Sequence, residues 1–256
     1  MQNGQEPAQN APRTIVYSTP GGVSLTLDLY RPARPGPLPV VMLVHGGGWC
    51  LGSKVGAEYA RHFTAAGYLA ADVEYRLAPG HLFPASCQDV QAAAQWLAAH
   101  VHEYGGDAAR LGAYGASAGA HLVAWLAVQA NTPLKCAVAW AGPMDMTRTP
   151  VTHPYRGYAL AFMGACQRDD PEAYAAASPM TQVSAAMPPL LLIHGQNDDV
   201  VPHEHAVWMQ EAARRVQAPV EIIVLPGVGH TGGNPQDPLH QAGWQGMFDF
   251  YARHLG

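Results

Sequence analysis

Short apolar runs alternate with segments of helical periodicity along most of this 256-residue chain. The apolar runs have the length and composition of buried strands, as in "VVMLVH" at 40–45. Between two such runs, apolar residues recur at spacings of four, three and four, at Val90, Ala94, Leu97 and Val101, which places them on one face of a helix. This alternation predicts βαβ units, and hence an α/β fold with a mostly parallel sheet and helices on both faces.

The N-terminal part departs from this alternation. "TIVYS" and "VSLTLDLY" alternate polar and apolar residues on either side of "TPGG", which is the pattern of a β-hairpin. The hairpin should add an antiparallel edge to the sheet. No internal repeat or low-complexity linker interrupts the chain, so we expect a tail over residues 1–13 and one domain over residues 14–256. Residues 143–187 lose the periodic pattern, and we expect them to form a small cap.

Composition narrows the class of partner. Hydrophobic residues make up 48% of the chain and charged residues 13%, so a large core is expected and disorder is not. The formal net charge is −5 and no basic stripe is present, which argues against nucleic acid and anionic membranes as partners. No apolar run approaches the roughly 18–20 residues needed to span a bilayer.

The four cysteines are far apart and form no C-x-x-C pair, so we expect no structural zinc or iron–sulfur cluster. Whether any of them form disulfides stays open, as does the oligomeric state. The first 13 residues lack the basic and apolar regions of a signal peptide, so the sequence as it stands predicts a cytoplasmic location. A secreted form whose signal had already been removed would read the same.

The strongest chemical motif follows the run "ARLGAYG". Gly115-Ala116-Ser117-Ala118-Gly119 has the form G-x-S-x-G and lies between a predicted strand and an Ala-rich predicted helix at 118–129. In that position the motif forms a sharp turn that exposes the serine hydroxyl at the top of the sheet. Ser117 is therefore the candidate nucleophile.

A serine hydroxyl needs a base, and the base needs a group that orients it. His230 is the histidine in the loop directly after the last predicted strand, and Asp198 and Asp199 follow "LLLIHG". The order Ser, Asp, His is that of α/β hydrolases. Asp145, at the end of the preceding strand, is the next candidate acid.

Other histidines receive structural interpretations. His121 lies four residues after Ser117 on the same predicted helix, where we expect it to pack. His203 and His205 in "PHEHA" have no third ligand nearby, so a solvated helix start is expected rather than a metal site.

Six motifs occur along the chain in an order that resembles a known family. "HGGGW", "EYRLAPGHLFPASCQDV", "GASAGAHL", "SPMTQV", "IHGQNDDVVP" and "GVGH" look like the α/β-hydrolase serine esterases, over nearly all of the chain from about residue 14. The match is closest to the hormone-sensitive-lipase-like carboxylesterases and the bacterial feruloyl- and acetyl-ester hydrolases. The resemblance implies a triad of Ser117, Asp198 and His230, with Asp198 as the acid because it stands four residues after the histidine of "HG".

The resemblance also implies an oxyanion hole. Carried over from the family, its donors are the backbone N–H groups of Gly47, Gly48 and Ala118, while His45 anchors the glycine loop. Such donors stabilise the negative charge that develops on a carbonyl oxygen during acyl transfer. A turn alone would also account for the glycine run, and the family pattern favours the oxyanion hole.

The substrate pocket is expected between the glycine loop and the cap. Trp49 borders the hole, and Tyr155, Tyr158, Phe162 and Met163 are the candidate lining from the cap. Because "HGGGW" begins at residue 45, little chain precedes it to form the longer N-terminal cap segment of the hormone-sensitive-lipase-like enzymes. This departure favours the smaller, more open feruloyl- and acetyl-esterase-like subtype.

These observations predict a serine hydrolase of small carboxylic esters that needs no metal or cofactor. An arylformamidase of the kynurenine pathway, built on similar glycine and serine motifs, is the alternative enzyme. A ligand receptor on the same fold, without catalysis, is the alternative of another class. The natural ester is not readable, because pocket shape depends on packing between distant loops.

Overall fold

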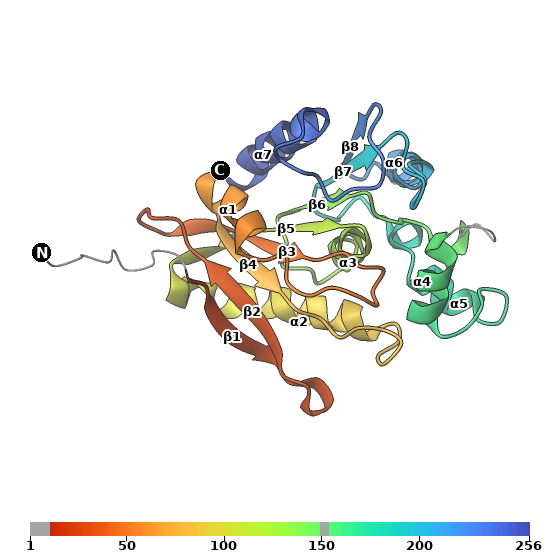
Figure 1. Ribbon diagram of the computed structural model, residues 1–256, viewed down its shortest axis with the longest axis horizontal. Coiled ribbons are helices and arrows are strands. Elements are labelled where there is room, and N and C mark those ends of the chain that lie inside the picture. Colours follow the sequence, from red (N-terminus) through yellow and green to blue (C-terminus); the bar gives the residue numbers. More distant parts are fainter. Residues whose placement is uncertain (1–10, 149–153) are drawn as a thin grey trace, which may run out of the picture.

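The computed structural model describes residues 11–148 and 154–256. Eight strands form one sheet (Figure 1): β1 Arg13–Ser18, β2 Leu25–Tyr30, β3 Leu38–Val44, β4 Leu69–Val73, β5 Gly106–Ala116, β6 Cys136–Trp140, β7 Leu190–Gly195 and β8 Val220–Leu225. The α-helices are α1 Ala57–Ala65, α2 Ala85–His100, α3 Ala118–Ala127, α4 Pro154–Met163, α5 Pro171–Ala176, α6 Glu204–Val216 and α7 Gln241–Leu255. Short 3-10 helices in the described ranges are η1 Pro20–Gly22, η2 Val101–Tyr104, η3 Met146–Arg148, η4 Pro179–Gln182 and η5 Pro238–His240.

The strand order is β1-β2-β4-β3-β5-β6-β7-β8. The β1–β2 and β2–β4 pairs are antiparallel, and all other pairs are parallel. The chain runs from β3 to β4 on one side and then resumes at β5 on the other side of β3. Such a reversal leaves a crevice beyond the carboxyl ends of β3 and β5, where ligands bind in open α/β sheets.

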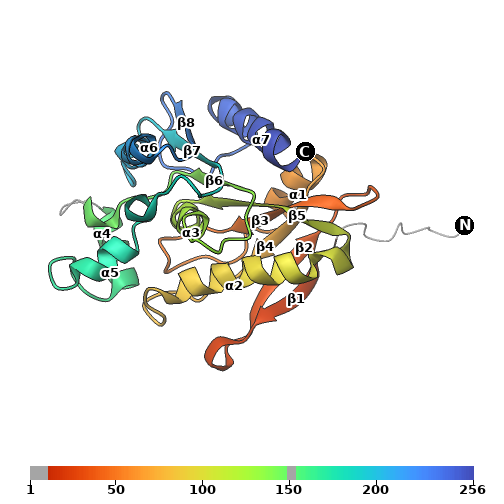
Figure 2. The same cartoon turned by 180° about the vertical axis from the view of Figure 1, so that it is seen from behind.

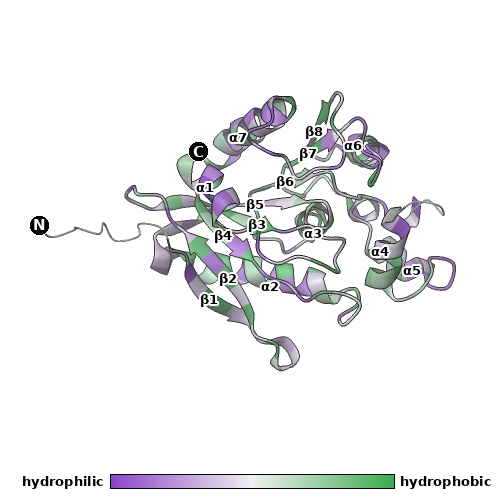
Figure 3. Ribbon diagram, in the orientation of Figure 1, coloured by the Kyte–Doolittle hydropathy of each residue, from purple (hydrophilic) through white to green (hydrophobic). Residues whose placement is uncertain are grey.

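Helices cover both faces of the sheet. One core contains buried residues of α2, α3 and α6, and the other contains those of α1 and α7. Figure 2 shows the face covered by α2, and α1 and α7 lie on the opposite side. Figure 3 shows that hydrophobic residues concentrate in the strands, whereas hydrophilic residues are frequent on peripheral helices such as α7. The α/β-hydrolase fold predicted from the sequence is confirmed.

One boundary differs in detail from expectation. Arg13 already pairs with Leu29 in the hairpin, so β1 begins at the last residue of the predicted tail. The expected tail otherwise falls mostly on residues 1–10, and part of the expected cap falls on residues 149–153, all outside the described residues. The rest of the cap segment contains α4 and α5, which lie together at one end of the molecule (Figure 1 and Figure 2).

The structure also shows the state of the cysteines and the lengths of the apolar helices. All four cysteines are free thiols. None of the helices in the described ranges is long and apolar enough to cross a membrane.

Candidate active site

Ser117 occupies a tight turn between β5 and α3. Its backbone has φ of 54° and ψ of −118°, which is strained for a residue with a side chain. The turn closes only because its flanking residues are small: a Cβ on Gly115 would lie 2.2 Å from the carbonyl oxygen of Gly119, and one on Gly119 would lie 2.1 Å from that of Val44. The geometry is that of a nucleophile elbow.

Three side chains from distant loops form a continuous hydrogen-bonded chain. His230 Nε2 lies 3.0 Å from Ser117 Oγ, and His230 Nδ1 lies 2.8 Å from Asp198 Oδ2. Because a carboxylate only accepts, the Nδ1 atom carries the proton and the Nε2 lone pair faces the serine hydroxyl. The structure thus brings together all three residues that the sequence predicts for the triad.

Asp198 is held rigidly as a carboxylate. Its Oδ1 accepts hydrogen bonds from the backbone N–H groups of Val200 and Val201, at 2.9 and 2.8 Å. Burial by itself raises the pKa of Asp198, but the hydrogen bonds from His194 and His230 outweigh burial and hold the pKa well below its ordinary value. The group therefore remains ionised at any working pH.

His194 is a neighbour of the triad that the sequence reasoning did not assign. Its Nε2 lies 3.1 Å from Asp198 Oδ2 and 2.8 Å from the carbonyl oxygen of Val201. Both of these atoms are acceptors, so Nε2 carries a proton and donates to them. The signal was present in the sequence, because His194 is the histidine of "HG" four residues before Asp198, but it served only as a family marker.

The glycine loop after β3 lies directly against the serine turn. A Cβ on Gly46 would come within 2.9 Å of the Ala116 carbonyl oxygen. His45 supports the loop: its ring stacks on Tyr75 with centroids 4.2 Å apart, and Tyr75 donates a hydrogen bond to the His45 carbonyl at 2.9 Å. Ala118 is the first residue of α3, a position whose N–H has no carbonyl partner within the helix.

A cavity of about 460 Å³ opens over Ser117 and His230. It is lined by Gly47, Gly48, Trp49, Leu51, Ser117, Ala118, Pro143, Tyr155, Tyr158, Val200, Val201 and His230. All three expected oxyanion residues lie on its wall, as do Trp49, Tyr155 and Tyr158. Leu51, Pro143, Val200 and Val201 were not expected, because they come from loops whose course the sequence pattern does not fix.

Phe162 and Met163 do not line this cavity, contrary to expectation. Both are buried in the core between the cap and the sheet. Phe162 stacks on the far side of Trp49, with ring centroids 4.6 Å apart, so it supports the wall instead of forming it. Their helix, α4, presents Tyr155 and Tyr158 to the cavity.

The remaining candidates have structural partners. His121 is fully buried, where its Nδ1 accepts from Trp49 Nε1 at 3.1 Å and its Nε2 donates to the Ala177 carbonyl at 2.7 Å. Asp145 accepts hydrogen bonds from Thr147 and pairs with Arg148 at 3.0 Å. Asp199 is exposed.

His203 and His205 differ from each other. His203 is partly exposed beside Glu204, at 3.6 Å. His205 is fully buried, contrary to the expected solvated face, and its Nδ1 accepts from the Asp145 backbone N–H at 3.3 Å. Within residues 11–148 and 154–256, no three His, Cys, Asp or Glu side chains are grouped to hold a metal.

Comparisons with known proteins identify the family of this chain. The chain is 33% identical over 227 residues to "Probable carboxylic ester hydrolase LipM" of Mycobacterium tuberculosis (strain ATCC 25618 / H37Rv), covering 80% of this chain and 52% of that protein. It is 34% identical over 227 residues to "Esterase LipC" of the same organism, with coverage of 80% and 56%. The chain thus spans about half the length of the curated relatives it matches.

A solved structure, "Truncated form of carbohydrate esterase from gut microbiota", has the same fold, with a TM-score of 0.83 and 23% identity over 96% of this chain and 97% of that one. The family profile BD-FAE matches residues 27–213, which is more than half of the chain. With the elbow, the strand order and this match together, the chain belongs to the BD-FAE family of α/β hydrolases.

Proposed function

We propose that this protein is a serine carboxylesterase that hydrolyses small carboxylic esters through an acyl-enzyme. The observation that carries the proposal is the unbroken chain of hydrogen bonds from Asp198 through His230 to Ser117, ending at an apolar cavity. The names of the curated relatives, which are esterases and carboxylic ester hydrolases, support the same reaction class.

In the first half-reaction, Ser117 Oγ attacks the ester carbonyl carbon while His230 Nε2 takes the hydroxyl proton. The carbonyl electron pair moves onto the oxygen, and the N–H groups of Gly47, Gly48 and Ala118 are the proposed donors to that oxyanion. When the carbonyl re-forms, the bond to the alcohol oxygen breaks and His230 returns the proton to the leaving alcohol. Asp198 stabilises the imidazolium between these two transfers.

In the second half-reaction, water attacks the acyl-enzyme carbonyl while His230 again takes a proton. The bond between Ser117 Oγ and the acyl carbon then breaks, Oγ regains its proton, and a carboxylic acid leaves. No metal or cofactor takes part in these steps.

We assign the substrate wall to Trp49 and Leu51 on the glycine loop and to Tyr155 and Tyr158 on α4. Residues 14–256 then act as one domain, with residues 143–187 as its cap. Aromatic and aliphatic side chains dominate this wall, which suits an uncharged acyl or aryl group.

The test is Ser117→Ala, measured on a short-chain aryl ester and with a fluorophosphonate label. Loss of a catalytic serine in comparable enzymes lowers kcat by roughly a million-fold, with a small remainder from the oxyanion hole and binding. We expect covalent labelling of the wild type at Ser117 only, and neither labelling nor turnover in the variant. A folded variant that keeps more than a few per cent of the activity would refute the mechanism.

Two measurements on the wild-type protein distinguish the esterase from the two alternative functions. Faster turnover of an aryl formamide than of the matching aryl acetate would favour an arylformamidase. A wild type that neither reacts with the label nor turns over any ester of the panel would favour the ligand receptor.

A further inference from the structure

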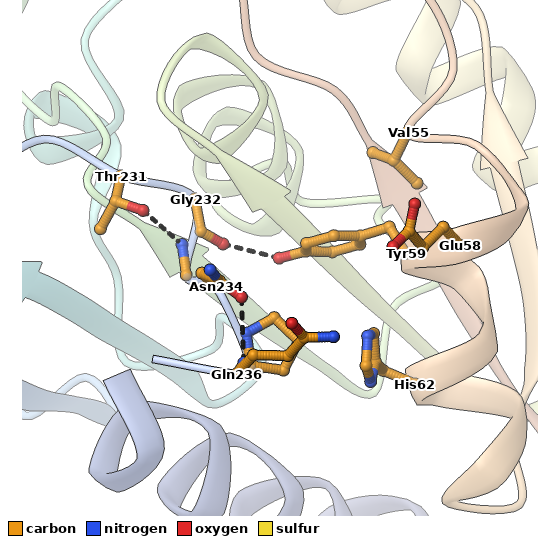
Figure 4. A pocket seen from close by; sticks show the side chains of 10 residues that line it. Val55, Glu58, Tyr59, His62, Thr231, Gly232, Asn234 and Gln236 are labelled. Atoms are coloured by element: carbon orange, nitrogen blue, oxygen red, sulfur yellow. Dashed lines mark hydrogen bonds between the residues drawn. The ribbon is translucent and has the colours of Figure 1, made fainter. Parts of the chain in front are cut away.

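The loop that carries His230 is fastened at one carbonyl group. The carbonyl oxygen of Gly232, two residues after His230, accepts hydrogen bonds from Tyr59 at 2.6 Å and from Tyr114 at 2.5 Å. The two tyrosine oxygens lie 2.5 Å from each other. Figure 4 shows Tyr59 reaching from α1 to the Gly232 carbonyl. Three oxygen atoms from three separate elements thus meet at one point beside the catalytic loop.

One of these contacts starts on the strand that carries the nucleophile. Tyr114 lies on β5, three residues before Ser117, and its side chain is fully buried. Gly232 itself packs against β5, since a Cβ on it would lie 3.0 Å from the Cβ of Ala116. A short rigid path therefore runs from Ser117 back along β5 to Tyr114, across to Gly232 and on to His230.

The protons of this group favour a firm attachment. The two tyrosine hydroxyls have two protons for three close oxygen contacts. The contact between the hydroxyls uses at most one proton, so at least one tyrosine always donates to the carbonyl oxygen of Gly232, which has two lone pairs. Burial raises the pKa of Tyr59, with the neighbouring Tyr114 as a further cause, and burial also raises the pKa of Tyr114. Both hydroxyls therefore remain protonated donors throughout the working pH range.

We propose that Tyr59 and Tyr114 are positioning residues for His230, which they hold at hydrogen-bonding distance from Ser117 through the carbonyl group of Gly232. The proposal rests on the esterase function proposed above. A displacement of about 1 Å in a catalytic group can lower the rate on the order of 100-fold. The 3.0 Å contact between His230 Nε2 and Ser117 Oγ is therefore sensitive to any drift of this loop.

The two tyrosines are separate from the substrate wall. Neither lines the cavity over Ser117. Tyr59 instead borders a second, more polar cavity of about 490 Å³ between α1 and residues 231–236, whose side chains are shown in Figure 4. Substitution should consequently act on the chemical steps and leave substrate contacts in place. Because His230 serves both half-reactions, kcat should fall while KM changes little.

The experiment compares Tyr59→Phe, Tyr114→Phe and the double variant with a matched control, Tyr251→Phe. Tyr251 is also fully buried in the same core and donates to a backbone carbonyl, that of Ala113, at 2.8 Å, but among the described residues no hydrogen bond or ring contact joins it to the His230 loop. Each preparation is titrated with a fluorophosphonate so that kcat refers to competent sites, and kcat and KM are measured on one aryl ester.

We expect kcat to fall about fivefold in each single variant, where one hydroxyl still holds Gly232, and about 100-fold in the double variant. KM should stay within about twofold. Tyr251→Phe should lose stability but keep its kcat per titrated site. The rate of fluorophosphonate labelling of Ser117 should fall in parallel with kcat, because His230 activates Ser117 in both reactions.

A double variant whose kcat stays within about threefold of the wild type overturns the proposal. If the double variant does not fold, Tyr114→Phe decides: a kcat equal to that of Tyr251→Phe also overturns it. A wild type that neither labels nor hydrolyses the ester instead refutes the proposed function, and the positioning role with it. The two failures are therefore distinguishable.

Discussion

Asp198 and Asp199 are adjacent in the chain, yet their surroundings differ. The side chain of Asp198 is enclosed and its two oxygens receive hydrogen bonds from Val200, Val201, His194 and His230. Asp199 points into solvent. One residue can therefore fix the imidazole tautomer, whereas the other ends a turn at the surface.

We predict that Asp198→Asn lowers kcat on the order of 10⁴-fold, because an amide in place of the carboxylate favours the wrong imidazole tautomer. Asp199→Asn should lower kcat by less than about tenfold, since no catalytic group depends on an exposed turn residue. The measurement is kcat on a short-chain aryl ester for both variants. The assignment fails if Asp199→Asn is the inactive one.

At the level of elements, the sequence predicts the strands and main helices well. Apolar runs identify β3, β4, β6, β7 and the more exposed strand β8, and the spacing of Val90, Ala94 and Leu97 identifies α2, because burial on one face imposes a period on the residues. The G-x-S-x-G pattern locates the elbow because only small residues allow the turn. These features depend on local sequence, so the sequence alone reveals them.

The features that the sequence did not predict depend on contacts between distant segments. Tyr59 and Tyr114 have no local pattern that marks them as neighbours of the triad. Phe162 and Tyr158 lie on the same short helix, and only the way in which α4 packs decides that Tyr158 faces the cavity and Phe162 faces the core. Such orientations follow from tertiary packing, which a single sequence does not encode visibly.

The glycine loop after β3 allows a test of its own. A Cβ on Gly47 would lie 2.1 Å from the Leu51 carbonyl oxygen, and its φ of +108° is unsuited to any side chain. A Cβ on Gly48 would meet the side chain of Tyr158, at 2.4 Å from Cδ1 and 2.6 Å from Cγ, and φ there is +58°, in the left-handed region that alanine adopts only at a cost.

We therefore predict that Gly47→Ala lowers kcat/KM by about 100-fold or more, the effect of losing an oxyanion donor. Gly48→Ala should lower it less, by about tenfold, because the left-handed backbone costs alanine only about 1–2 kcal/mol and the clash is with a side chain of α4, not with the backbone of the glycine loop itself. Kinetics on an aryl acetate with folded, titrated enzyme compare the two. Equal losses would show that the loop does not distinguish these positions.

Helix α3 is joined to the cap segment through His121, and this link should depend on pH. Burial lowers the pKa of His121 to about 4, although its hydrogen bond to Ala177 opposes the shift. Between pH 6.5 and about 4 the unfolded chain thus binds a proton that the folded protein does not, so stability falls as pH falls. His205 acts in the same direction, because burial lowers its pKa to about 3.

We predict that His121 accounts for a loss of roughly 2 kcal/mol in the free energy of unfolding between pH 7 and pH 4.5. In His121→Gln the amide can keep both hydrogen bonds but does not titrate. The stability difference between wild type and variant should accordingly shrink as pH falls, as measured by urea unfolding at several pH values. A difference that is constant over this range would contradict the prediction.

On the scale of the whole molecule, the net negative charge of the chain and the uncharged lining of the cavity both disfavour an anionic substrate. The chain carries a formal net charge of −5. Among the described residues that line the cavity over Ser117, none is Asp, Glu, Lys or Arg, so an anionic acyl chain would lose its hydration without gaining a cationic partner. Uncharged esters should therefore be preferred, because they are neither repelled by the net charge nor stripped of hydration without a charged partner.

A pair of aryl esters of similar acyl length tests this preference: a butyrate and a hemisuccinate, whose free carboxylate is ionised at neutral pH. We predict that kcat/KM is about 100-fold lower for the hemisuccinate, because burying an unpaired carboxylate costs several kcal/mol even after relaxation. Long-range repulsion by the net negative charge accounts for only a part of this difference in kcat/KM, and added salt removes that part by screening. Measurements at low and high ionic strength separate the two causes. Selectivity that persists at high salt is the expected outcome, whereas equal rates for the two esters would show that the acyl chain does not enter this cavity.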